Sequence, residues 1–174
     1  MFCSGSESSQ VEHFRPKEVF PALAMTWSNF LWVCGLCNNQ KGIKFPTLDD
    51  GATLINPMEE DVWGYFFIDQ FGNLSERWRP DLEAIDPRAR LTVQVLALDR
   101  EALQVSRRAR LRNLEELARY AVQCLEAGLR SKVEVRASFE DWKTHPFQSD
   151  VADYFLVGPG REQEPFKTLI EMST

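Results

Sequence analysis

The clearest pattern along the chain is an apolar residue at every third or fourth position over residues 107–127. That spacing places the apolar side chains on one face of an α-helix, and Gly128 supplies a stop. The residues that carry the pattern are Leu111, Leu114, Leu117, Ala118, Ala121 and Leu125. We therefore predict an amphipathic helix whose apolar face packs inside the chain.

Shorter patterns precede this helix. Residues 47–60 are rich in Asp, Gly and Pro, which is typical of a connector. Residues 63–68 predict a short aromatic strand that residues 70–73 turn into a hairpin. Residues 91–98 fit either a strand or the opening of a helix, and Asp99 can cap the segment after it.

Two further elements are expected near the C-terminus. A helix is predicted after Ser138, with Asp141 in the capping-box position. Residues 151–157 form another apolar stretch, which the Gly-Pro-Gly at residues 158–160 ends. The second half of the chain is thus expected to be mainly helical.

Composition bounds the class of protein. With 174 residues and 44% hydrophobic content, the chain can bury a core as one compact unit or as a small finger with a helical extension. Four cysteines without an apolar signal segment favour a reducing cytoplasm. No run approaches the roughly 20 apolar residues of a membrane span, so we expect a cytoplasmic protein with no membrane partner.

The candidate chemistry lies near the start of the chain. Glu12 precedes His13, Asn29 lies in an apolar run over residues 27–33, and Asn38 comes just after a CxxC pair. Cleaving a phosphodiester requires a base to deprotonate water, and the ordinary pKa of histidine lies near neutrality, so His13 is the natural general base. Mg²⁺ or Mn²⁺ prefers hard oxygen ligands, which Glu12 and the side-chain carbonyl of Asn38 supply. These are the parts of a one-metal phosphodiesterase.

This assignment carries two geometric expectations. Adjacent residues of a strand point to opposite faces, so Glu12 and His13 converge on one phosphate only where the strand ends or bends, for which residues 14–16 provide a place. The amide of Asn29 is expected to hydrogen-bond the backbone across the two apolar runs and to fix the loop that carries His13. Asn29 would then position the base and would not react.

The chain carries the strings EHFRPK, TWSNFLWVCGLCNNQKGIKFP and, later, LINP. In these strings it closely resembles the HNH endonucleases of bacterial anti-phage systems, the group found in Septu and retron loci. The resemblance covers residues 13–46 well. It implies a ββα-metal finger, with strands around residues 10–14 and 28–33 and a short helix starting near Cys37.

Carried over residue by residue, the resemblance makes Glu12 and Asn38 the ligands of a catalytic Mg²⁺ or Mn²⁺, His13 the general base and Asn29 the positioning residue. The implied fold class is α+β.

The resemblance also implies a division of labour along the chain. Residues 1–50 would form the nuclease finger, and residues 51–174 a mainly helical adaptor region packed on it. The activity implied is metal-dependent hydrolysis of nucleic-acid phosphodiesters, of DNA in the first place and RNA in the second, by the effector of a defence complex. The partners implied are an ATPase of the ABC or SMC-like kind and, in retron systems, a reverse transcriptase with its RNA–DNA product.

One departure from the family concerns zinc. Proteins that resemble this chain carry a CxxC before the histidine strand, which completes a four-thiolate zinc site with the second CxxC. Here only Cys3 stands in that region, in addition to Cys34 and Cys37. Either the natural chain starts upstream of Met1, or these three thiolates hold zinc with another ligand, or no zinc is bound.

The net charge of −6 is unusual for a nuclease, because affinity for nucleic acid comes mostly from lysine and arginine. We therefore expect another subunit to supply much of the grip on the substrate. The basic residues around the proposed site are the expected local contacts: Arg15, Lys17, Lys41 and Lys44. A second basic cluster opens the predicted long helix and is equally well explained as a solvated helix face: Arg107, Arg108, Arg110 and Arg112.

Other readings of the same residues stay open. The finger can be a non-catalytic module that binds nucleic acid or protein, and the CxxC can serve redox chemistry or zinc sensing. His145 is expected in a loop without a catalytic role, and Cys124 as a small buried residue of the long helix. Four aromatic residues are expected to form a small core under the finger rather than a stacking surface for bases: Trp27, Phe30, Trp32 and Phe45.

Overall fold

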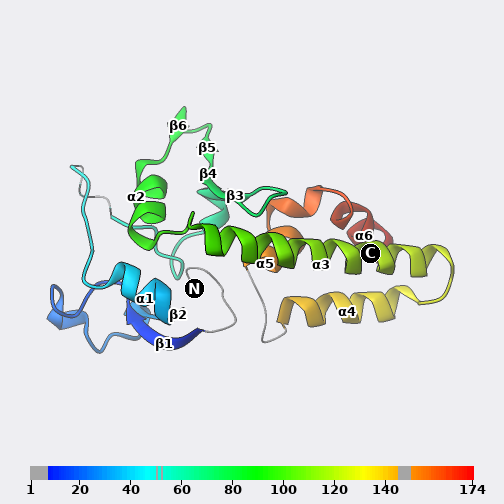
Figure 1. The fold of residues 1–174 in the computed structure, drawn as a ribbon, viewed down its shortest axis with the longest axis horizontal. Coiled ribbons are helices and arrows are strands. Elements are labelled where there is room, and N and C mark those ends of the chain that lie inside the picture. The colour runs from blue at the N-terminus through cyan, green and yellow to red at the C-terminus, as the bar shows by residue number, and fades with distance from the viewer. Residues whose placement is uncertain (1–7, 50, 52, 145–149) are drawn as a thin grey trace.

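Figure 1 shows the fold in a computed structural model, which describes residues 8–49, 51, 53–144 and 150–174. The chain opens with an antiparallel hairpin of β1 (Ser8–His13) and β2 (Phe30–Cys34), and the helix α1 (Gly35–Lys41) comes directly after β2. The two strands and the short helix were predicted in this order. β2 and α1 each begin about two residues away from the predicted position.

The pleat gives the β1–β2 hairpin two different faces. Glu12 lies opposite Leu31 in the register, and Leu31 and Val33 are buried on that side, where α1 packs. His13 lies opposite Phe30, so these two residues share the other face. We call this second side, with Val11, His13, Phe30 and Trp32, the outer face of the hairpin.

The middle of the chain contributes two more hairpins and one helix. The hairpins are β3 (Phe66–Ile68) with β4 (Leu74–Glu76) and β5 (Trp78–Arg79) with β6 (Ala84–Ile85). The predicted turn at residues 70–73 therefore forms. Residues 91–98, which fitted a strand or a helix, lie largely in α2 (Pro87–Leu96), whose first turn is capped by Asp86.

The remaining chain is helical, as predicted. The long helix α3 (Glu101–Glu126) carries the predicted apolar stripe, and Gly128 lies just beyond its end with a positive φ of 64°. Three helices come after it: α4 (Lys132–Thr144), α5 (Asp150–Leu156) and α6 (Phe166–Ser173). Short 3₁₀ turns cover Pro21–Leu23, Trp27–Asn29, Val62–Gly64 and Pro159–Glu162. The fold class is therefore α+β.

The predicted start of α4 after Ser138 was wrong. The helix begins seven positions earlier, where Ser131 and Glu134 form a reciprocal capping box: Ser131 N donates to Glu134 Oε2 at 2.8 Å, and Glu134 N donates to Ser131 Oγ at 3.3 Å. The Ser-x-x-Glu signal was present in the sequence. Ser138 instead lies inside the helix, where its hydroxyl accepts from Arg130.

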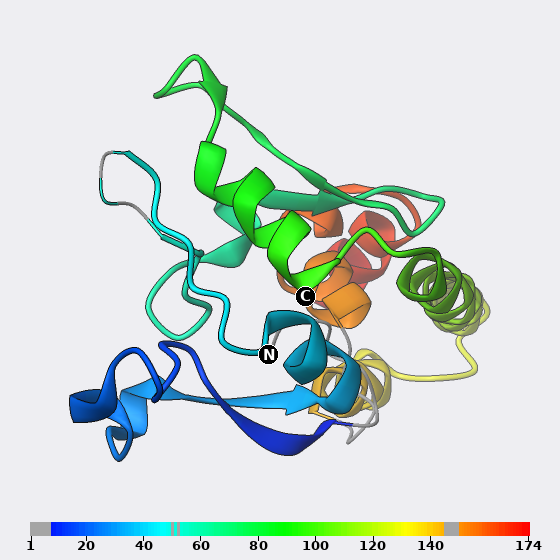
Figure 2. The ribbon, with the colours of Figure 1, turned by 60° about the vertical axis from the view of Figure 1, so that its left-hand side comes forward.

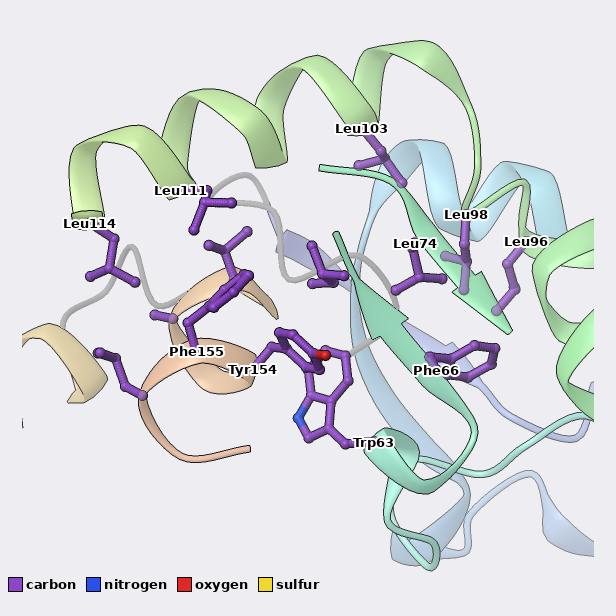
Figure 3. Packing of buried hydrophobic residues seen from close by; sticks show 14 of the residues in the cluster. Trp63, Phe66, Leu74, Leu96, Leu98, Leu103, Leu111, Leu114, Tyr154 and Phe155 are labelled. Atoms are coloured by element: carbon purple, nitrogen blue, oxygen red, sulfur yellow. The ribbon is translucent and has the colours of Figure 1, made fainter. Parts of the chain in front are cut away.

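The main core lies where α3, α5 and the β3–β4 hairpin meet, and Figure 3 shows its side chains closing on one another. Trp63 stacks edge-on against Tyr154 with ring centroids 5.0 Å apart, and its indole Nε1 donates to Asp153 Oδ2 at 2.6 Å. A buried ion pair joins α3 to α5, because Arg107 Nε donates to Asp150 Oδ2 at 2.6 Å. These contacts fix the helical part as one packed body.

The hairpin and α1 lie at one end of this body, and the turn between α3 and α4 lies at the other (Figure 1). α1 packs against α2, which joins the β1–β2 hairpin and α1 to the rest of the chain. Across the described residues, no helix is long and apolar enough to cross a membrane.

Candidate active site

His13 is the last residue of β1, which is the strand end that the proposed chemistry requires. Its ring nitrogen Nε2 lies 2.9 Å from the carbonyl oxygen of Ala24. A carbonyl can only accept, so Nε2 carries the proton in this contact, and the neutral imidazole keeps its lone pair on Nδ1. The ring also packs edge-on against Phe30, with centroids 5.1 Å apart. His13 is thus held in one orientation with a defined basic nitrogen.

Asn29 binds the backbone of the loop between β1 and β2 through both ends of its amide. Its Oδ1 accepts from Arg15 N at 2.8 Å, while its Nδ2 donates to Arg15 O at 3.0 Å and to Leu23 O at 3.1 Å. The side chain is buried. These are the backbone contacts that the sequence analysis expected, and they hold the loop whose Ala24 carbonyl orients the histidine.

Lys41 does not lie on the surface, so its expected contact with nucleic acid was wrong. The side chain is fully buried, at 0% exposure, and its ammonium donates to Glu12 Oε1 at 2.5 Å and to His13 O at 2.7 Å. Burial of a lysine is tolerated because these oxygens replace its water shell. Lys41 therefore ties α1 to the end of β1 and neutralises the Glu12 carboxylate.

Asn38 lies on the same side of α1 as Lys41, three residues earlier, and its Nδ2 donates to Gln10 Oε1 at 2.8 Å. The Asn38–Gln10 and Lys41–Glu12 contacts lie side by side, because Gln10 and Glu12 are two residues apart on β1 and point to the same face. Within the described part of the chain, no hydrogen bond joins the His13 ring to the side chain of Glu12 or of Asn38. The fold brings both proposed ligands to the β1–α1 interface and places the base on the outer face, at the strand end.

The donor set of this interface suits a hard divalent cation in its chemistry. Glu12 Oε2 and Asn38 Oδ1 are oxygen atoms on facing elements, and neither makes a hydrogen bond to another described residue. Mg²⁺ commonly takes one or two protein oxygens and completes its shell with water and phosphate. Within the part of the chain that the structure describes, no three or more His, Cys, Asp and Glu side chains lie close enough together to hold a metal ion by themselves. Glu12 and Asn38 therefore fit a metal bound jointly with substrate.

The CxxC pair lies at the start of α1. Both side chains are buried; Cys34 Sγ accepts from Cys37 N at 3.4 Å, and Arg100 Nη2 donates to Cys37 Sγ at 3.6 Å. Two neighbouring sulfurs are suitable zinc donors. The third expected ligand, Cys3, lies outside the described residues, as does His145.

The other basic residues divide into surface and core. Arg15, Lys17 and Lys44 are exposed and remain available to phosphates. Arg107 is not, because it forms the buried pair with Asp150, so the second basic cluster is only partly a surface feature. A pocket of about 90 Å³ beside Asn29 is far too small for a nucleotide, so a nucleic acid would lie on the open surface.

The expectation that Trp27 and Trp32 belong to a small core was wrong. Trp27 is 84% exposed and Trp32 is 52% exposed. Phe45 does pack inward, edge-on against Phe14 at 5.4 Å, and Phe30 is partly buried between His13 and Trp27.

Several contacts that build the site were missed; Lys41 was expected there as a nucleic-acid contact, and its buried bonds to Glu12 and His13 were not expected. Lys41 stands one helical turn after Asn38, and Gln10 stands two strand positions before Glu12, so periodicity alone could have placed them on the shared interface. The Ala24 carbonyl and Arg100 had no local signal, since a backbone oxygen has no sequence signature and Arg100 is 63 residues from Cys37.

The chain is 31% identical over 94 residues to the Septu protein PtuB of Bacillus thuringiensis. The match covers 54% of this chain but only 32% of the relative, so the chain spans about a third of the length of the curated protein it matches. No family model and no solved structure matches the chain. The identity supports a distant relationship to a Septu protein, and it agrees with the group that the N-terminal strings resemble.

Proposed function

We propose that the chain is a metal-dependent endonuclease of the HNH type that acts in Septu anti-phage defence. The observation that carries the proposal is the hydrogen bond from His13 Nε2 to the Ala24 carbonyl, at the end of a strand that also carries Glu12. In this contact Nε2 carries the proton, which would leave Nδ1 free to act as the base.

In the proposed reaction, Nδ1 of His13 takes a proton from the attacking water while Nε2 stays bonded to Ala24. Asn29 keeps the loop in place, so that the ring does not rotate away during proton transfer. Glu12 and Asn38 would hold Mg²⁺ or Mn²⁺, which when bound stabilises the charge on the phosphate and on the leaving oxygen. The phosphate would lie at the end of β1, where both faces of the hairpin are within reach.

The proposed substrate is DNA in the first place and RNA in the second. The relationship to a Septu protein and the net charge of −6 together support action within a multi-protein complex. By the resemblance of the sequence, the proposed partner is an ABC or SMC-like ATPase, with or without a retron reverse transcriptase.

One observation favours a second candidate function, a non-catalytic finger that binds nucleic acid or protein within the same assembly. The ammonium of Lys41 already neutralises Glu12, and a divalent cation would have to bind beside it. A finger in which that ion pair replaces the metal would keep its shape without chemistry.

The deciding experiment is cleavage of plasmid DNA and of tRNA with Mg²⁺ or Mn²⁺, by the purified chain and by the chain co-expressed with its genomic neighbours. His13→Ala should lose about 10²- to 10⁴-fold in rate. Val11→Ala changes an exposed residue of the same strand and should cleave normally. Wild-type rates in His13→Ala, or no cleavage in any of these preparations, would reject the nuclease and leave the binding finger.

A further inference from the structure

Three large apolar side chains of the loop between β1 and β2 are exposed, and Met25 and Trp27 are more exposed than Val19. Met25 is 89% exposed and Trp27 is 84% exposed. Folded chains bury most such side chains, so a group of them beside a candidate site indicates a binding surface. Figure 2 shows this loop at the edge of the molecule, projecting away from α3 and its neighbouring helices.

Hydrogen bonds hold the backbone of this loop in one conformation. Thr26 N donates to Leu23 O at 3.1 Å, Asn29 N donates to Thr26 O at 3.0 Å, and Asn29 Nδ2 donates to Leu23 O. The carbonyl of Ala24 within the same segment accepts from the candidate base. Trp27 is therefore presented outward by a structured turn, and little entropy would be lost when a ligand binds it.

The ring of Phe30 connects this surface to the candidate base. Trp27 packs edge-on against Phe30, with centroids 6.3 Å apart and an interplanar angle of 88°. Phe30 packs in the same manner against His13, at 5.1 Å and 69°. The exposed indole thus lies one ring away from His13, on the outer face of the hairpin.

The surroundings of the indole suit a polyanion better than an apolar protein surface. Arg15 and Lys17 are exposed in the same loop, where Glu18 is the one carboxylate before Trp27 in the sequence; Glu59 from the connector lines a small pocket with Arg15 and Thr26, and the whole chain has a net charge of −6. Trp32 extends the exposed aromatic surface along β2. Exposed aromatic rings beside basic side chains are the usual means by which proteins bind single-stranded nucleic acid.

We infer that Trp27 is a stacking residue for an unpaired base of the substrate, so that the site prefers single-stranded or locally opened nucleic acid over an intact duplex. Trp27 contacts a substrate only if the chain is the nuclease proposed above, but base stacking on Trp27 can be measured as binding, without cleavage. The base would stack on the indole, Arg15 and Lys17 would contact the adjoining phosphates, and the chain would place the next phosphate at His13.

The test is equilibrium binding at low salt with EDTA present, which prevents metal-dependent cleavage. The probes are a fluorescein-labelled oligothymidylate, an abasic oligomer of the same length, and a blunt duplex. Trp27→Ala should weaken oligothymidylate binding by about tenfold or more, Trp27→Phe should retain most of it, and abasic binding should not change. Trp78→Ala is the matched control, because Trp78 is 60% exposed on β5, away from the β1–β2 hairpin (Figure 1).

Unchanged oligothymidylate binding in Trp27→Ala would overturn the inference, and so would an equal loss on the abasic oligomer or failure of the wild type to bind any probe. Intact nucleic-acid binding combined with loss of a co-purifying subunit would assign the loop to a protein partner instead. The melting temperature of Trp27→Ala checks that the fold is retained. Because binding is measured without metal, a stacking result stands even if His13→Ala proves the nuclease assignment wrong.

Discussion

The ammonium of Lys41 lies 2.5 Å from Glu12 Oε1 and 2.7 Å from the His13 carbonyl oxygen. One buried cation therefore contacts both the proposed metal ligand and the proposed general base. The ammonium thus holds the backbone at the end of β1 and also compensates the negative charge of the Glu12 carboxylate. Any metal that binds Glu12 does so beside a fixed positive charge. Loss of Lys41 should therefore lower the free energy of unfolding, whether or not the site is catalytic.

Lys41→Met should destabilise the chain by about 3–5 kcal/mol, because it leaves a largely buried carboxylate without its partner. Lys44→Met is the control, since Lys44 is exposed and its ammonium donates to the carbonyl of Gln40. Urea unfolding followed by circular dichroism measures both. Equal unfolding free energies in the two variants would mean that the ion pair adds nothing to the fold.

Asn29→Ala should reduce cleavage and should also lower the free energy of unfolding by about 1–3 kcal/mol, because three backbone groups lose a buried partner. Ser28→Ala, at an exposed neighbouring position, should do neither. If Asn29 positions the base, the activity loss at saturating substrate should exceed what the unfolded fraction explains. A loss in proportion to unfolding alone would make Asn29 merely structural.

Asn38→Ala should weaken Mn²⁺ binding and cleavage together, because it removes one of the two proposed oxygen ligands. Asn39→Ala changes the adjacent exposed amide and should bind Mn²⁺ as the wild type does. Isothermal titration calorimetry with Mn²⁺ alone gives the comparison. The same affinity in both variants would remove Asn38 from the ligand set.

Glu60 anchors the connector that carries the LINP string. Burial by itself would raise the pKa of this carboxyl, but hydrogen bonds from Arg88, from the backbone of Asn56 and from Tyr65 hold the pKa below its ordinary value of 4.5. A carboxyl with a depressed pKa in the folded state stabilises the fold above its unfolded pKa, and that stability is lost as the pH falls through the folded pKa.

Glu60→Gln should therefore be less stable than the wild type near pH 7, and the difference should shrink as the pH falls below about 4.5, where the wild-type carboxyl takes up its proton. Urea unfolding across this pH range measures the difference. Glu59→Gln, at an exposed neighbour, serves as the control. A difference that stays constant with pH would show that charge on Glu60 is not what stabilises the connector.

Local patterns predicted most of the elements. The stripe from Leu111 to Leu125 predicted α3, and the resemblance implied the order of strand, loop, strand and helix around His13. Most of the signals that failed depend on distant contacts; the start of α4 is the exception, because its Ser131–Glu134 capping box is local. A lysine such as Lys41 is by default a surface residue, and only the positions of Glu12 and the His13 carbonyl, 29 and 28 residues away, make its burial possible.

The aromatic residues failed for a related reason. Hydrophobic character places a residue inside by default, and the sequence does not reveal that the turn around Thr26 points Trp27 outward while Asn29 takes the interior position. The pair Glu12 and His13 was placed correctly at a strand end. Whether both side chains can reach one phosphate could not be predicted from the sequence, because it depends on the backbone conformation of the residues that follow β1.

The turn between α3 and α4 lies at the end of the molecule opposite the β1–β2 hairpin (Figure 1). Gly128 has a φ of 64°, and Leu129 beside it is exposed. Among the described residues beyond its chain neighbours, no atom lies within 4 Å of where a Cβ at Gly128 would be. Such turns tolerate inserted residues. An affinity tag placed after Gly128 would let the chain be immobilised with the hairpin facing solution, so that oligonucleotides reach it without competition from the resin.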